Sequence, residues 1–210
     1  MTRSPGALAH HFETLPQQRE ANVLGMWIFL VTEILFFGAL FATYTVYRLA
    51  YPATFEAASQ HLDPVRGTIN TAILLTSSLT VALSVHAAET RNRRVMVMMM
   101  VVTALLGLAF LGIKATEYYT EYVENLIPGY NFIWEGPDER PAALFFTIYF
   151  IMTGIHALHM IIGIGVLIVM IYFAWRGYYD VDPMPVERFG LYWHFVDIVW
   201  IFLFPLLYLI

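Results

Sequence analysis

The stretch WIFLVTEILFFGALF, residues Trp27–Phe41, is apolar almost throughout and contains one ionisable residue, Glu33. The apolar run extends on both sides, from about Leu24 to Tyr47. A helix of this length, at ~1.5 Å rise per residue, crosses a hydrocarbon core of about 30 Å. The stretch therefore predicts a transmembrane helix that holds Glu33 inside the hydrocarbon. A bare carboxylate there costs several kcal/mol or takes up a proton instead.

The composition of the whole chain is that of an integral membrane protein. Of its 210 residues, 59% are hydrophobic and only 13% are charged, whereas average proteins have about 45–50% and about 25%. The absence of cysteine excludes disulfides, Cys-ligated zinc, iron–sulfur clusters and a Cys nucleophile in this chain. There is no basic stripe, so a nucleic acid is not expected as a partner.

Four further apolar segments are long enough to span a membrane. The five predicted helices cover about residues 24–47, 68–88, 95–119, 141–175 and 189–210. A polar segment, residues 1–23, precedes them and lacks the apolar core of a signal peptide. Membrane strands would need about ten residues of alternating pattern, which is absent. The predicted fold class is all-α, a polytopic membrane bundle of five transmembrane helices in one domain, residues 24–210.

Lysine and arginine are distributed unequally between the two sides of this predicted bundle. The N-terminal side holds Arg3, Arg19, Arg91, Arg93, Arg94, Arg176 and Arg188, and the opposite side holds Arg48, Arg66, Lys114 and Arg140. The positive-inside rule therefore predicts a cytoplasmic N-terminus and an external C-terminus. Most acidic residues, including Glu117 and Glu121, are expected in the outer loops. The longest of these loops, about residues 120–140, is expected to form a cap or a contact surface for partners.

The ionisable residues inside the predicted helices are the candidate functional groups. They are Glu33, His86, His156, His159, His194 and Asp197. Intramembrane ionisable residues are functional hypotheses by default, with a proton path as one role and hydrogen bonding between helices as the other. Metal or haem ligation is a further hypothesis for His156 and His159. The i, i+3 spacing predicts that these two histidines share a helix face, and that His194 pairs with Asp197 in the same way.

The depths of these groups follow from the helix rise. Glu33 lies about 13 Å, Asp197 about 12 Å and His194 about 8 Å from the N-terminal side of the hydrocarbon. His86 ends its helix on the same side. Most of the ionisable groups are therefore expected in the cytoplasmic half of the membrane, with His156 and His159 nearer the middle. The expected neighbours of Glu33 are the histidine and aspartate groups at similar depth, or a partner subunit.

Five stretches resemble, in order, subunit III of the haem-copper cytochrome oxidases. They are GMWIFLVTEILFFGALFATY, NTAILLTSSLTVALSVHA, GIKATEYY, TGIHALHMIIGIGVLIV and YWHFVDIVWIFLFPLLYLI. The intramembrane glutamate of that family falls on Glu33, and its Gly–x–His–x–x–His segment falls on His156 and His159. The resemblance covers about Gly25–Ile210. Larger members have seven helices, and this chain resembles the five-helix bacterial type, which lacks the first two.

The resemblance implies a non-catalytic accessory subunit of a proton-pumping terminal oxidase in the bacterial inner membrane. Such a subunit holds no haem or copper, since these belong to partner subunits, and it packs against subunit I in a complex that includes subunit II. It binds phospholipid and supports both proton uptake and the stability of the complex. Any catalysis, the reduction of O₂ with proton translocation, belongs to the complex, which can join a larger respiratory assembly.

Other functions remain open from the sequence alone. One is an accessory subunit of a nitric-oxide-reductase-like complex, and another is a membrane di-haem electron carrier. A third is a small proton-coupled transporter using Glu33 and Asp197, although the internal repeats or broken helices usual in transporters are not visible. The sequence does not choose between cytochrome c and quinol as the electron donor of an oxidase.

Overall fold

The computed structural model describes residues 14–180 and 182–210, which form six α-helices and one 3₁₀ turn. The helices are α1 (Leu15–Ala50), α2 (Pro52–Ser59), α3 (Pro64–Glu89), α4 (Arg93–Val123), α5 (Glu139–Trp175) and α6 (Met184–Tyr208), and the turn is η1 (Tyr178–Asp180). All helices except α2 are long and apolar enough to span a membrane. The prediction of an all-α bundle with five spans is confirmed.

The largest differences from the sequence prediction are the early start of α1 and the additional helix α2. Helix α1 begins well before the apolar run, because Thr14 caps it with a hydroxyl that accepts from the Gln17 N–H at 3.4 Å, and Pro16 occupies its first turn. Its first turns therefore lie in the stretch assigned to the polar N-terminal segment, whose residues 1–13 are outside the described part. Helix α2 was not predicted, because its eight residues are too few for a spanning segment.

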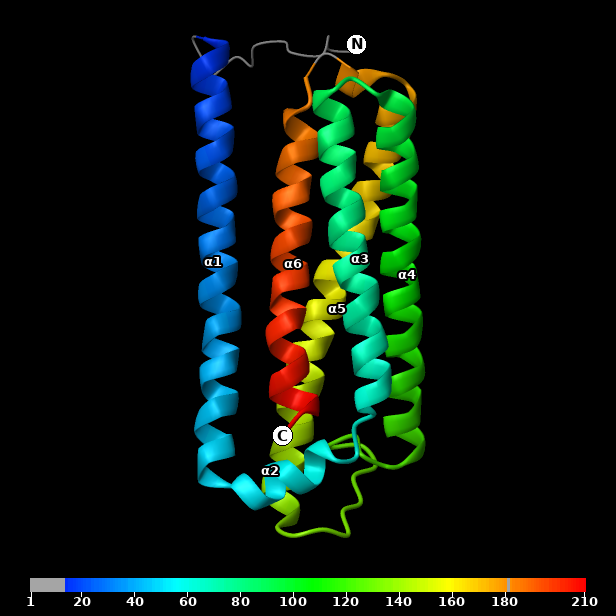
Figure 1. Ribbon diagram of the computed structural model, residues 1–210. Coiled ribbons are helices and arrows are strands. Elements are labelled where there is room, and N and C mark those ends of the chain that lie inside the picture. Colours follow the sequence, from blue (N-terminus) through cyan, green and yellow to red (C-terminus); the bar gives the residue numbers. More distant parts are fainter. Residues whose placement is uncertain (1–13, 181) are drawn as a thin grey trace.

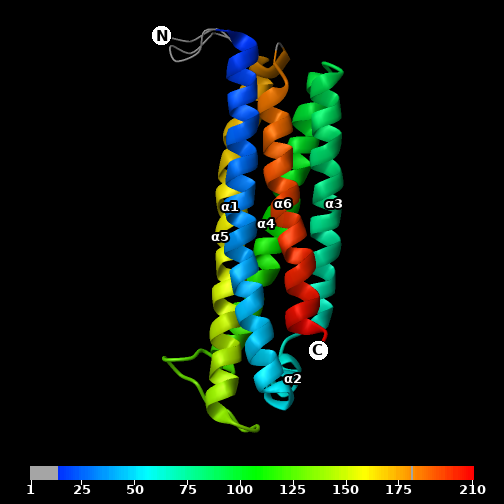
Figure 2. The ribbon, with the colours of Figure 1, turned by 90° about the vertical axis from the view of Figure 1, so that its left-hand side faces the viewer.

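Helices α3, α4, α5 and α6 pack into a four-helix bundle, and α1 stands at its side (Figure 1). Seen from that side, α1 lies over α5 and α6 (Figure 2). Only 11% of the spanning window of α1 is buried within the chain, against 33–50% for the other spans. Helix α1 therefore leaves most of its apolar surface for lipid or for another protein.

The bundle has two distinct ends (Figure 1). The end that carries the start of α1, the α3–α4 turn and η1 is called the N-terminal end, and the end near α2 and the chain's C-terminus is called the C-terminal end. The positive-inside rule assigns the N-terminal end to the cytoplasm, and this orientation stays a prediction.

The C-terminal end of α6 is held by side chains of α1 and α2. The last carbonyl groups of a helix have no partner within the helix. Here the Tyr44 hydroxyl of α1 donates to the Leu206 carbonyl, and the Ser59 hydroxyl of α2 donates to the Leu207 carbonyl at 2.8 Å. The short helix α2 therefore helps to fix the C-terminal end of the bundle.

The long loop between α4 and α5, residues 124–138, packs back onto the bundle. Phe132 and Trp134 contact the ring of Phe146 at centroid distances of 5.9 and 6.1 Å, and Leu126 is buried. Trp134 also lies 5.0 Å from the ring of His61, which follows α2. The loop thus forms the expected cap over the C-terminal end, and its role as a partner surface stays a prediction.

Candidate functional site

Glu33 of α1 pairs with His159 of α5 across the helix interface. Its Oε2 atom lies 3.2 Å from His159 Nε2, and the two side chains are only 20% and 15% exposed. The Phe37 ring packs on the imidazole at a centroid distance of 5.4 Å. The carboxyl group therefore faces protein, as expected, but its partner is a histidine that the depth estimate placed nearer the middle of the membrane.

The second ring nitrogen of His159 is held by its own helix. The other ring nitrogen, His159 Nδ1, lies 2.9 Å from the Ile155 carbonyl oxygen, which only accepts, so Nδ1 carries a hydrogen. The Nε2 atom is therefore the ring nitrogen that faces the Glu33 carboxyl group across the α1/α5 contact.

His156 occupies a different environment from His159. Its ring is buried among Phe110 and Trp200, at centroid distances of 5.5 and 5.3 Å. Neither ring nitrogen makes a hydrogen bond to a described residue. The two histidines are neighbours on α5 at i, i+3 spacing, but only His159 contacts Glu33 of α1, whereas His156 contacts rings of α4 and α6.

His194 and Asp197 of α6 are neighbours at the same spacing, but the predicted pairing between them is wrong. His194 Nδ1 lies 2.7 Å from the Ser78 hydroxyl oxygen of α3. Asp197 is 2% exposed, and its oxygens make no hydrogen bond of ordinary geometry to the described residues, although Ser78 lies beside it. Ser78 thus stands between the two predicted partners.

His86 lies apart from the other candidates. Its side chain is 72% exposed at the end of α3, with Nδ1 3.8 Å from the carboxylate of Glu89. An exposed pair at this separation contributes about 0–1 kcal/mol to stability. The structure gives His86 no place in a buried site.

The sequence analysis missed a buried polar network centred on Lys114. That residue was assigned to the outer charges, but its Nζ atom lies inside the bundle, 3.0 Å from Glu117 Oε2. Nζ also donates to the hydroxyl groups of Tyr149, at 3.1 Å, and Tyr208, at 2.5 Å. Both hydroxyl groups in turn donate to Glu117 Oε1, at 3.0 and 2.5 Å. The four side chains, from α4, α5 and α6, thus satisfy one another.

The network is shielded from its surroundings. Lys114 is 2% and Glu117 is 1% exposed. Four aromatic rings lie 4.8–5.4 Å from the ammonium group, which adds cation–π attraction. A buried ion pair is tolerated only when its remaining hydrogen-bonding groups are satisfied, as they are here. The Lys–x–x–Glu spacing within GIKATEYY was the available signal, because i, i+3 residues are neighbours on a helix.

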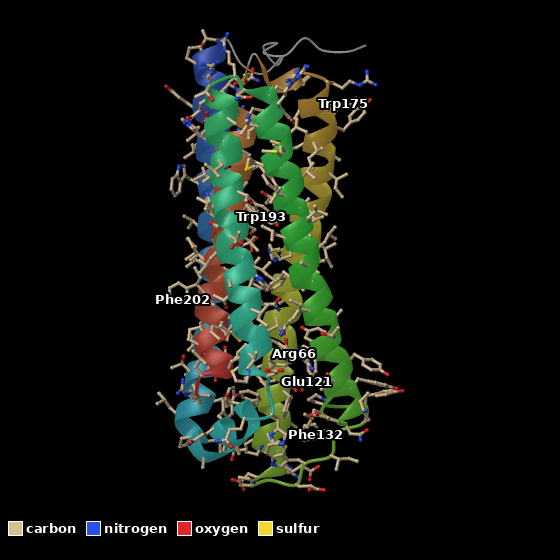
Figure 3. The ribbon with its side chains drawn as sticks, turned by 45° about the vertical axis from the view of Figure 1, so that its right-hand side comes forward. Arg66, Glu121, Phe132, Trp175, Trp193 and Phe202 are labelled. Atoms are coloured by element: carbon tan, nitrogen blue, oxygen red, sulfur yellow. The ribbon has the colours of Figure 1, made fainter. Side chains whose placement is uncertain are left out.

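Glu121 extends the polar groups of α4 toward the C-terminal end. It is 2% exposed, so its assignment and that of Glu117 to an outer loop are wrong. Figure 3 shows Glu121 close to Arg66, between α3 and α4. Arg66 donates from Nη1 to the Thr120 hydroxyl at 3.0 Å. Arg66 and Glu121 are therefore charged residues of α3 and α4 at positions where hydropathy places the ends of the spans.

The described residues contain no group of three or more histidine, aspartate or glutamate side chains placed to hold a metal ion. The two histidines of α5 do not converge, since His159 faces Glu33 and His156 faces the bundle interior. The geometry therefore gives no support to ligation of a metal or haem by this pair.

These observations define a polytopic membrane protein whose buried ionisable groups are paired between helices. The profile of the family described as Cytochrome c oxidase subunit III matches residues 9–210 of the chain. The chain therefore belongs to the cytochrome c oxidase subunit III family. This establishes an accessory subunit of a haem-copper oxidase, one that assembles with other oxidase subunits in a membrane.

Several curated relatives are similar over nearly their whole length. A protein of Staphylococcus haemolyticus (strain JCSC1435) is 31% identical over 192 residues, which cover 91% of this chain and 90% of the relative. A protein of Staphylococcus epidermidis (strain ATCC 12228 / FDA PCI 1200) is 30% identical over 207 residues, covering 96% and 95%. Both carry the name "Probable quinol oxidase subunit 3".

Proposed function

We propose that this chain is subunit III of a quinol-oxidising haem-copper oxidase in a bacterial cytoplasmic membrane. In this role it packs against the catalytic subunit I and helps to supply it with protons from the cytoplasmic side. The observation that carries the proton role is the Glu33–His159 pair, which brings two ionisable groups of α1 and α5 within 3.2 Å of each other. The choice of quinol as donor is supported by the names of the curated relatives.

The position of the pair suits proton collection. Glu33 lies about 13 Å from the N-terminal side of the hydrocarbon, by the helix rise. The two side chains keep 20% and 15% exposure, so a polar group of a partner subunit can contact the pair in the complex. An ionisable pair inside a membrane is a functional hypothesis by default. The chain thus offers a proton-holding group at intermediate depth, beside the poorly covered helix α1.

The uncovered surface of α1 supports the packing role. A helix with an apolar surface and few contacts inside its own chain is completed by lipid and by helices of a partner. In the proposed complex, subunit I covers part of this surface, subunit II lies in the same assembly, and bound phospholipid fills the remainder. Haem and copper are held by the partner subunits, where electrons reach O₂.

The first test is a pull-down of the tagged chain in a mild detergent, followed by visible spectroscopy and mass spectrometry. We expect haem absorbance, copper and a large membrane subunit to accompany the chain, together with quinol-dependent O₂ consumption. A colourless chain that runs alone would contradict the proposal. Activity with reduced cytochrome c but not with quinol would overturn the choice of donor alone.

Glu33→Gln tests the proton role in the purified complex. The glutamine amide can donate to His159 Nε2 as a carboxylic acid does, so we expect assembly and stability to change by less than about 0.5 kcal/mol. The amide cannot take up and release a proton as a carboxyl group does, so proton uptake by vesicles holding the complex should slow several-fold.

His86→Gln is the matched control, because His86 is an exposed residue at the N-terminal end. It should leave both assembly and proton uptake unchanged. Equal proton-uptake rates for the wild type and Glu33→Gln at every pH would show that Glu33 has only a structural role.

A further inference from the structure

A groove of about 450 Å³ runs between α1 and α6. Aromatic side chains form much of its wall, including Trp27, Phe37, Phe41, Phe195 and Phe202. Along α6 the groove extends from Leu191 to Phe202, about 16 Å by the helix rise. It lies between the bundle and the helix that stands apart from it (Figure 1), so a ligand can enter from the bilayer.

One polar ring lies on the wall inside this groove. Apart from Trp27 at its N-terminal mouth, His194 is the one lining residue with a polar side chain. Its Nδ1 atom is engaged by the Ser78 hydroxyl at 2.7 Å. Its Nε2 atom makes no hydrogen bond to a residue in the described ranges 14–180 and 182–210, so this atom is available for a hydrogen bond to a ligand.

The depth of His194 selects the kind of ligand. The residue lies about 8 Å inside the hydrocarbon, by the helix rise. The polar part of a phospholipid stays in the interfacial region, so only its acyl chain would pass this histidine. An acyl chain would leave Nε2 unpaired in an apolar medium, which is unfavourable. The groove therefore fits a molecule that carries a hydrogen-bonding ring on an apolar tail.

We propose that the α1/α6 groove binds the isoprenoid quinol or quinone of the membrane, with its ring at His194 and its tail along Ile198 and Phe202. The identity of this ligand rests on the proposed function, since a quinol-oxidising complex works among such molecules. The aromatic wall provides faces on which a flat ring can stack. The proposal concerns binding alone, and oxidation of the quinol takes place in the partner subunits.

The Ser78 hydroxyl lets His194 serve both redox forms of the ligand. When Ser78 donates to Nδ1, the neutral ring carries its hydrogen on Nε2 and can donate to a quinone carbonyl. When Nδ1 donates to Ser78, Nε2 accepts from a quinol hydroxyl, and the Ser78 hydrogen can turn toward the buried Asp197 beside it. This assigns Asp197 the role of a positioning residue behind the site.

The test uses the purified complex in phospholipid vesicles and a photoreactive azido-quinone with a decyl tail. We expect light to cross-link this probe to peptides of α1 and α6, and excess unlabelled decyl-quinol to prevent it. His194→Leu removes the hydrogen bond and should lower labelling about five- to tenfold.

Two glycines on different helices provide a variant that fills the groove and a matched control. Gly38 lines the groove, and a Cβ atom added to it meets no other atom within 4 Å, so Gly38→Leu fills the groove without a clash at Cβ. Gly112 of α4 is equally open but does not line the groove. Labelling should be lost in Gly38→Leu and kept in Gly112→Leu.

Two outcomes would overturn the proposal. One is cross-linking of the groove by a phospholipid with a photoreactive acyl chain that decyl-quinol does not displace. The other is a groove that cross-links to helices of a partner subunit and excludes the quinone probe. In both, a complex that still contains haem and copper leaves the proposed function intact. Quinone labelling of the groove in a chain without oxidase subunits would instead support the site while the proposed function fails.

Discussion

Replacing Lys114 with methionine is expected to lower the free energy of unfolding by about 3–5 kcal/mol. Methionine fills much of the lysine volume, so the loss comes from charge and not from a cavity. Glu117 would remain as a 1% exposed carboxyl group without its cation, and the hydroxyl groups of Tyr149 and Tyr208 would each lose a donor. A buried charge without a partner in a low-dielectric interior strongly lowers the free energy of unfolding.

The double variant Lys114→Met/Glu117→Leu separates charge from packing. Because both charges are gone, most of the lost stability should return. Unfolding in mixed detergent micelles, followed by circular dichroism, measures each variant. Glu89→Gln, in the exposed pair with His86, serves as control and should stay within about 0.5 kcal/mol of the wild type. A double variant as unstable as the single one would contradict the explanation.

The sequence predicts the five spans because hydropathy over a long window depends on length and composition alone. Hydropathy is less informative at span ends. Lys114 and Glu117 lie in the last turns of the predicted span 95–119 and Glu121 lies just beyond it, and all three were assigned to the outer side because an isolated charge is expensive in the membrane. The structure shows that Lys114 and Glu117 are tolerated in the interior because they pair with each other and form hydrogen bonds with tyrosines of α5 and α6. That compensation depends on tertiary contacts, which no window along the chain contains.

The candidate site was predictable in part for a similar reason. The depth of Glu33 could be estimated from the helix rise, but its partner is His159, which the same estimate placed nearer the middle of the membrane. Helical spacing gave the wrong partner for His194, which pairs with Ser78 and not with Asp197. It also did not show that His156 and His159 contact different helices. Spacing tells which residues are neighbours on one helix, but not where the contact with the next helix ends. Ser78, which joins His194 to α3, carries no signal in the sequence.

Trp200→Ala is expected to cost about 3–5 kcal/mol in unfolding free energy. The indole is fully buried, with the rings of Phe110 and His156 at 4.8 and 5.3 Å. Its Nε1 atom donates to the Thr71 hydroxyl at 3.1 Å, which links α6 to α3. The side chain also lies 5.4 Å from Lys114 Nζ and so closes one side of the buried network. Removing it leaves a cavity at the contact of four helices, where packing is the main source of stability in a membrane.

The matched control is Trp175→Ala, because Trp175 is 69% exposed at the end of α5 and points away from the bundle (Figure 3). It should change the unfolding free energy by less than about 1 kcal/mol. Trp200→Phe keeps a ring but loses the hydrogen bond to Thr71, so an intermediate loss is expected. Circular dichroism during unfolding in mixed micelles and the amount of haem that co-purifies with each variant give two independent readouts. Equal losses for the Trp200→Ala and Trp175→Ala variants would show that interfacial anchoring, and not the packing around Trp200, governs the stability of the bundle.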